Sequence, residues 1–395
     1  MAHGRCLLPA RPAPDPDMPG KYQVKYMREN DFSRLEINLP NCLANYRYFR
    51  SLLSPTTKML VLVKANAYGH GIVEFASMME QAGADYLAVA YPVEGVELRR
   101  AGIKAPILVL TAGTDFFGEI IDNGLEPGIP NMFTLREFCK VLEARGINDY
   151  PIHLKLDTGM HRLGFMTSEL PELESFLGGS GRVAVKSVYS HLAAAEDPAS
   201  DSFTLGQIRM FQENAARISG AVGYRPMYHI LNSAGIERFP EYQFDMVRLG
   251  IGIYGVSALA DVRLWPVASF KCKILQIKHL SPQDGAIGYG RRGHIAPGGT
   301  DIATIPVGYA DGVDRRLGCG AASFLLNGHR VPTIGNICMD MCMLDITGVD
   351  AEVGDTVTIF GQDPTAQELA SILGTIPYEI FTSIPRRVER IIVKD

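Results

Sequence analysis

The chain has 395 residues, of which 47% are hydrophobic and 21% charged, and its formal net charge is −5. This composition is typical of a soluble globular protein, and the length favours two domains. Because no block of basic residues occurs, nucleic acid is not expected among its partners.

The N-terminal segment differs from the rest of the chain, since it carries five prolines between Pro9 and Pro19. Proline is excluded from helix interiors and central strands, so residues 1–28 are predicted to be a disordered extension. The segment lacks the apolar stretch of a secretory signal peptide, and no later stretch is long enough to cross a membrane. The seven cysteines are scattered without a CxxC pair, as in proteins with reduced thiols. We therefore expect a cytoplasmic protein with no membrane partner and no metal.

Eight short apolar runs follow, and helical patterns separate them. The runs are MLVLVK (59–64), YLAVA (86–90), PILVL (106–110), LEPGI (125–129), PIHLKLD (151–157), VAVKSVYS (183–190), MYHIL (227–231) and FDMVRLG (244–250). Most lack polar alternation, as expected of parallel strands that are buried on both faces. Eight strand–helix units in about 200 residues predict a (β/α)8 TIM barrel, to which we assign residues 29–256. An open doubly wound sheet is the alternative, but its GxGxxG fingerprint is missing after the first strand.

The pattern changes after residue 256, where β-rich runs alternate with glycine turns. These runs predict a second, mostly β domain over residues 257–395, with a helix near 365–374 and a last strand in RIIVKD. The run RLEINL at 34–39 precedes the barrel and is a candidate to pair with this domain.

Polar residues gather at the predicted C-terminal ends of the barrel strands, where the active sites of such barrels form. In chain order they are Lys64, Lys155, Asp157, Ser190, His191, His229, Ser233 and Arg248, followed by Gly250 and Ile251. The ends of the last two strands are the usual phosphate site, and small residues there let backbone amides approach an anion. A lysine across from a phosphate site suggests a phosphate-bearing cofactor that forms a Schiff base. Taken singly, each residue has an ordinary explanation, such as a solvated lysine or a core histidine.

Several blocks of the sequence resemble the alanine racemase family. VLVKANAYGHG resembles the family's attachment signature for pyridoxal 5′-phosphate, and the likeness continues through KLDTGMHRLGF, SHLAAAED, HILNSAG, MVRLGIGIYG, GYGRR, PVGYADG and ICMDM. It covers roughly residues 33–395 in order. The resemblance implies interconversion of L- and D-alanine, a role in supplying D-alanine for peptidoglycan, and a homodimer with composite active sites.

The resemblance also implies roles for individual residues. Those implied in cofactor binding are Lys64, which forms the Schiff base, Tyr68, His191, Ser233, Arg248, Gly250 and Ile251. Those implied in binding the substrate carboxylate are Arg162 and Met339. Lys155 is the position that is carbamylated in many members, and Tyr289 acts in the active site of the partner subunit.

The chemistry of racemisation agrees with these roles. A proton must leave one face of the α-carbon and return on the other, so two bases are expected, and Lys64 and Tyr289 meet that demand. The resemblance implies that Arg248 faces the pyridine nitrogen. Because an arginine remains a donor at neutral pH, the nitrogen is then expected to stay unprotonated. The weaker electron sink that results limits transamination.

Two positions depart from the pattern of the family. Arg386 stands where many members place a tyrosine on the cofactor phosphate, and Asn336 replaces the commoner arginine ahead of ICMD. These changes leave open whether serine or a broader set of amino acids is the substrate. Two less favoured classes of protein are a barrel-type decarboxylase, which would have an acidic residue at Arg248, and a non-enzymatic carrier of the cofactor, which would lack the β domain.

Overall fold

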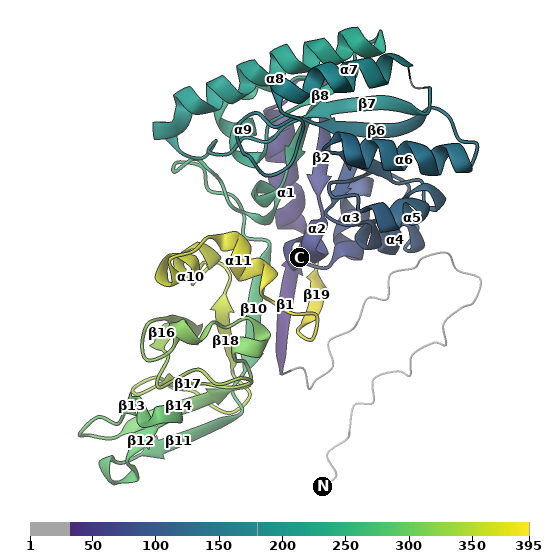
Figure 1. Ribbon diagram of the computed structural model, residues 1–395. Coiled ribbons are helices and arrows are strands. Elements are labelled where there is room, and N and C mark those ends of the chain that lie inside the picture. The colour runs from purple at the N-terminus through teal and green to yellow at the C-terminus, as the bar shows by residue number, and fades with distance from the viewer. Residues whose placement is uncertain (1–31, 180, 395) are drawn as a thin grey trace.

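A computed structural model describes residues 32–179 and 181–394, so the predicted extension over residues 1–28 lies outside the described residues. Figure 1 shows a barrel surrounded by helices and a β-rich part that extends away from it. No helix within the described ranges is long and apolar enough to cross a membrane.

Eight parallel strands form the barrel in the order β8-β7-β6-β5-β4-β3-β2-β9. They are β2 (Lys58–Leu62), β3 (Tyr86–Val89), β4 (Ile107–Val109), β5 (Glu126–Ile129), β6 (Tyr150–Lys155), β7 (Val183–Tyr189), β8 (Met227–His229) and β9 (Met246–Leu249). Each overlaps one of the eight predicted runs, so the predicted barrel is confirmed. Backbone hydrogen bonds from Asp245 to Tyr228 and from Arg248 to Leu231 join the two ends of the sheet and nearly close it.

Helices cover the outer face of the barrel, which explains why its strands are apolar on both faces. These helices are α1 (Leu39–Ser51), α3 (Ile72–Gln81), α4 (Pro92–Arg100), α5 (Phe117–Asp122), α6 (Met132–Ala144), α7 (Leu170–Gly179) and α8 (Asp201–Val222). Two short helices, α2 (Lys64–Tyr68) and α9 (Ser233–Arg238), follow β2 and β8 directly at the C-terminal ends of these strands.

The β-rich part consists mainly of two sheets, in the orders β16-β15-β18-β10-β1-β19 and β11-β14-β17. The first contains β1 (Ser33–Asn38), β10 (Ala268–Lys273), β15 (Ser323–Leu326), β16 (His329–Pro332), β18 (Thr356–Phe360) and β19 (Glu389–Val393). The second contains β11 (Gln276–Leu280), β14 (Thr300–Ile305) and β17 (Cys342–Asp345), and a hairpin of β12 (Ala286–Ile287) and β13 (Gly293–His294) lies beside it. The predicted helix near 365–374 is α10 (Ala366–Leu373), and α11 (Pro377–Thr382) follows it.

The strand that precedes the barrel belongs to the β-rich part, as the sequence suggested. β1 pairs antiparallel with β10 and parallel with β19, so it lies between the first strand after the barrel and the last strand of the described chain. From β1 on, the described chain therefore leaves the six-stranded sheet, passes through the barrel and returns to the same sheet.

Candidate active site

The turn after β2 has an unusual backbone. Ala65, Asn66, Ala67 and Tyr68 all have positive φ angles, of 52°, 55°, 52° and 53°. Left-handed backbone costs a residue with a β-carbon roughly 1–2 kcal/mol, so such a run persists only where its surroundings impose it. The turn directly follows Lys64 and fixes where the side chains of Lys64 and Tyr68 lie relative to each other.

Glu94 on α4 holds this turn in place. One of its carboxylate oxygens accepts a hydrogen bond from the Ala65 amide at 2.6 Å, and the other accepts from Ala90 and Tyr91 at 2.8 and 3.1 Å. Glu94 thus ties the first amide of the turn to the segment that precedes α4, which helps the turn to keep its strained conformation. Glu94 gave no signal in the sequence, because a glutamate in the first turn of a helix is common.

A small polar cradle lies at the ends of β8 and β9. The amides of Gly250 and Gly252 donate to Ser233 Oγ at 2.9 and 3.1 Å. A Cβ atom on Gly250 would lie 3.1 Å from the Tyr68 hydroxyl oxygen and 3.7 Å from Ser233 Oγ. Any side chain on Gly250 would therefore fill the space between these hydroxyl groups, and the cradle suits an anion such as a phosphate. Ile251 begins the short 3-10 helix that follows, over residues Ile251–Tyr254.

Tyr68 remains a donor in this cradle, because burial raises the pKa of its hydroxyl group. Its ring contacts the ring of Tyr254 at 4.6 Å and that of Tyr378, on α11, at 5.8 Å between centroids. Burial also raises the pKa of Tyr378 to about 12. Tyr378 was missed in the sequence, where a single tyrosine in a predicted helical segment gave no signal.

Arg386 is paired with an acid of α4, and no contact among the described residues joins it to the cradle. Its guanidinium forms an ion pair with Glu97 of α4 at 3.1 Å, in which the Arg386 side chain is largely exposed and the Glu97 side chain is partly buried. Arg386 thus connects the β-rich part with the barrel.

Positive charge is concentrated at the C-terminal end of the barrel. Lys155 interacts electrostatically there with Lys64, Arg162 and Arg248, and Lys64 also interacts with Arg162. Burial, and next the charge of Arg162, lower the pKa of Lys64, while Glu94 opposes the shift. Burial and the charges of Arg162 and Arg248 lower the pKa of Lys155 to about 8. The arrangement would accommodate a ligand with several negative charges.

Arg248 is buried, and its Nη atoms form hydrogen bonds to backbone carbonyls and histidines around it. Nη1 contacts the carbonyl of His229 and its Nδ1, and Nη2 contacts the carbonyls of Ser190 and Ile230 and Nδ1 of His191. Burial lowers the pKa of Arg248 to about 10, so the guanidinium stays charged at neutral pH. Burial and Arg248 lower the pKa of His191, which is therefore neutral and can accept. Nε–H of Arg248 has no acceptor among the described residues and remains available to a ligand.

Tyr289 and Met339 are not brought to Lys64 within one chain. They are 70% and 54% exposed, and no contact given for the described residues joins either to the barrel. Figure 1 shows β12 and β13, which flank Tyr289, at the end of the β-rich part away from the barrel. The Asn336 side chain donates to the carbonyl of Tyr289 at 2.8 Å and so helps to fix this exposed loop.

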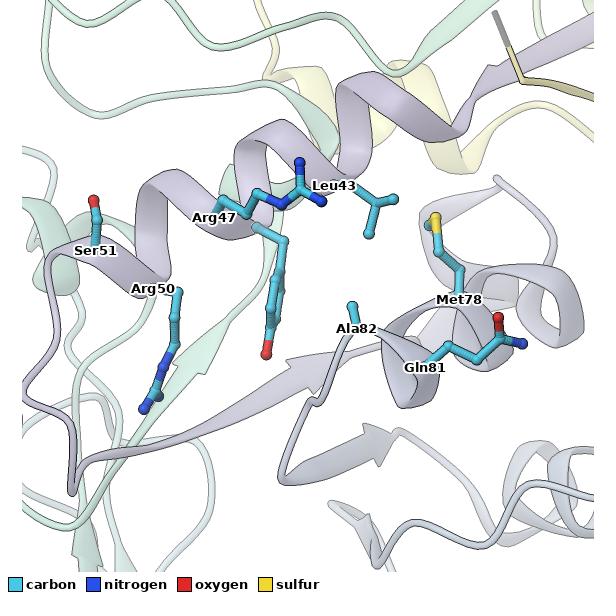
Figure 2. Close-up of a pocket in the computed structure, with 8 residues that line it drawn as sticks. Leu43, Arg47, Arg50, Ser51, Met78, Gln81 and Ala82 are labelled. Atoms are coloured by element: carbon cyan, nitrogen blue, oxygen red, sulfur yellow. The ribbon is translucent and has the colours of Figure 1, made fainter.

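A separate groove of about 670 Å³ lies between α1 and α3 (Figure 2). Arg47 and Arg50 line it, but its lining includes no acid, histidine, lysine or cysteine. Arg50 already donates to the carbonyls of Thr57 and Pro55. We therefore assign the chemistry to the end of the barrel.

Comparison with known proteins identifies relatives over most of the chain. The family model for the alanine racemase N-terminal domain matches residues 37–258, and that for the C-terminal domain matches residues 267–392. Alanine racemase of Synechocystis is 38% identical over 373 residues, which are 91% of this chain and 98% of that protein. Alanine racemase 2 of Caldanaerobacter subterraneus is 36% identical over 377 residues, which are 91% and 95% of the two chains.

Solved structures give the same result. Alanine racemase of Clostridium difficile has a TM-score of 0.86 at 34% identity and covers 92% of this chain and 96% of its own. The alanine racemase of Bartonella henselae, with covalently bound pyridoxal phosphate, has a TM-score of 0.83 at 29% identity. The match covers 92% of this chain and 99% of that one.

Proposed function

This chain belongs to the alanine racemase family and interconverts L- and D-alanine, and we propose that it does so with pyridoxal 5′-phosphate bound covalently to Lys64. The observation that carries the proposal is the position of Lys64 beside the cradle. β2 and β9 are paired, so Lys64 and Gly250 follow neighbouring strands at the same end of the barrel. The relative from Bartonella henselae carries this cofactor covalently. When bound, the cofactor withdraws electrons from the α-carbon of the amino acid and so makes its proton acidic.

The residues around Lys64 fit the two ends of such a cofactor. Hydroxyl groups of Tyr68 and Ser233, with the backbone amides of Gly250 and Ile251, would hold the phosphate. Nε–H of Arg248 would donate to the ring nitrogen, and the neutral His191 would pack against the ring. Arg162 and the backbone of Met339 are proposed to hold the substrate carboxylate.

The two bases are proposed to be Lys64 and Tyr289 of the partner subunit. Lys64 would exchange the proton on one face of the α-carbon, and the phenol of Tyr289 would exchange it on the other. The exposed ring of Tyr289 is the main support, because a 70% exposed tyrosine in a short turn has no packing role in its own chain. The active form would be a homodimer in which each site uses both chains.

Arg248 is proposed to keep the ring nitrogen unprotonated. Arg248 donates to three carbonyl groups, and these groups would repel a carboxylate in its place. Arg248→Lys is therefore a better test of this role than a change to an acidic residue. A lysine ammonium can give up its proton, whereas a guanidinium holds it. We expect racemisation to fall about 100-fold and the yield of pyruvate per racemised alanine to rise, as measured by coupled assays on one sample. An unchanged ratio of pyruvate to D-alanine would argue against this role.

Lys155 is proposed to be carbamylated. At a pKa of about 8, about one amine in ten is neutral at pH 7, and the neutral nitrogen can attack CO2, forming an N–C bond and releasing a proton. The product is an anion beside Arg162. We expect a carbamate signal in 13C NMR under labelled CO2 at fixed pressure, which grows as the pH rises through about 8. A signal that persists in Lys155→Gln would assign the modification to another residue.

The substrate is tested by incubating the pure protein with a panel of L-amino acids and separating the products by chiral chromatography. Alanine should be racemised fastest, and serine is the second candidate, because Asn336 and Arg386 alter the surroundings of the site. We further propose a cytoplasmic location and a role in supplying D-alanine for peptidoglycan. The decarboxylase and carrier classes are not supported, because both domains match the racemase family.

A further inference from the structure

Five consecutive barrel strands each contribute one polar side chain to the barrel interior. The residues, which we call the interior chain, are Glu126 on β5, His153 on β6, Ser187 on β7, His229 on β8 and Arg248 on β9. Neighbouring members are joined by hydrogen bonds of 2.7, 2.6, 2.8 and 2.9 Å in that order. The three central side chains are fully buried. Glu126 begins its strand, so the chain runs from the end of the barrel opposite the site to Arg248.

Arg248 fixes the direction of the two hydrogen bonds nearest to it, which are Arg248–His229 and His229–Ser187. A guanidinium only donates, so His229 Nδ1 must accept from Arg248 Nη1 at 2.9 Å. Burial, and next Arg248, hold the pKa of His229 well below its usual value, so this imidazole is neutral. Its one proton therefore lies on Nε2, which donates to Ser187 Oγ at 2.8 Å.

The Glu126 end fixes the remaining bonds in the same sense. Burial alone would raise the pKa of Glu126, but hydrogen bonds from His153 and Tyr86 contribute to a net lowering, so the carboxylate is ionised and only accepts. His153 Nε2 must then donate to it at 2.7 Å. Ser187 has accepted from His229, and its own proton is free to go to His153 Nδ1 at 2.6 Å. Each of the four hydrogen bonds in the interior chain thus has one donor and one acceptor.

We propose that the interior chain has this single direction and that it makes Glu126 a positioning residue for Arg248. One part of this inference rests on the proposed function, namely that Arg248 donates to the ring nitrogen of the cofactor. While both imidazoles are neutral, reversal of any one bond would place two N–H groups, or two acceptors, face to face in the buried interior, which is strongly unfavourable. With His229 Nδ1 held as an acceptor, the guanidinium keeps one orientation and its Nε–H stays directed to the ligand.

Neutron diffraction from the deuterated, cofactor-loaded protein tests the direction without any variant. We expect deuterium on His229 Nε2 and His153 Nε2, none on either Nδ1, and the Ser187 deuteron directed at His153. Deuterium on His229 Nδ1, or a doubly deuterated His153 with the Ser187 deuteron directed elsewhere, would overturn the proposal. This measurement is independent of whether Lys64 binds the cofactor, so a failure of the proposed function would be seen separately.

Kinetics of Ser187→Ala test the effect on the site. The variant leaves His229 Nε2–H without an acceptor, so we expect kcat for alanine to fall about tenfold while KM changes less than about twofold. The matched control is Thr204→Val, which removes a fully buried hydroxyl group on α8 that has no hydrogen-bond partner among the described residues. A Ser187→Ala variant as active as this control would show that the interior chain does not position Arg248.

Discussion

Replacing Lys64 by alanine is expected to reduce racemisation by at least about 10⁴-fold, because the residue is both the attachment point of the cofactor and one of the two bases. Alanine cannot form a covalent bond to the cofactor, so borohydride reduction should no longer fix it to the chain. In the wild-type protein, reduction followed by peptide mapping should place the label on the peptide that contains Lys64.

Lys58→Ala is the matched control, because Lys58 lies on the same strand but is exposed at its other end. It should retain the label and the rate of the wild-type protein. Lys155 is a second buried lysine at the end of the barrel and, with its pKa lowered to about 8, the most reactive competitor for the label. A label on Lys155 in the wild-type protein would contradict the assignment of Lys64.

Mixing two inactive variants is expected to restore activity. If Lys64 and Tyr289 of the partner subunit form each site, then Lys64→Ala and Tyr289→Ala are each inactive as homodimers. A mixed dimer has one site with both defects and one site with none. Random reassociation of equal amounts makes half of the dimers mixed, so about one quarter of the wild-type rate should return.

The hydroxyl group of Tyr289 can be tested separately from its ring. Tyr289→Phe keeps the ring at the expected interface but removes the proton-transfer group, so it should complement Lys64→Ala as well as Tyr289→Ala does. The measurement is the rate of D-alanine formation after reassociation, with each variant alone as the baseline. No recovery of activity above that baseline would indicate that each chain works alone.

The barrel could be predicted from the sequence because its strands are buried on both faces, which makes them continuous apolar runs. The residues at the site could be located because the C-terminal ends of parallel strands meet at one end of the barrel. The structure brings together Lys64, Lys155, Arg248 and the cradle at Ser233 and Gly250, as the strand ends predict.

Other parts depend on contacts that no local pattern records. The left-handed turn consists of ordinary residues such as Ala65 and Ala67, whose own preference is for other conformations, and it is held by Glu94 from a different helix. The interior chain was missed because Glu126, His153 and Ser187 lie in three separate runs. Their pairing depends on the register of the strands around the barrel, which the sequence alone does not specify.

The position of β1 affects both the folding of the protein during synthesis and the design of fragments of it. Leu35 pairs with Phe270 on one side and Arg390 on the other, so during synthesis this strand emerges long before either neighbour exists. Contacts between such distant parts of the chain form slowly. A fragment cut at the covalent boundary after the barrel would lack the strand between β10 and β19 and expose two open sheet edges, which favour aggregation. Separating the two halves as independent folding units would therefore require grafting β1 onto the C-terminal fragment.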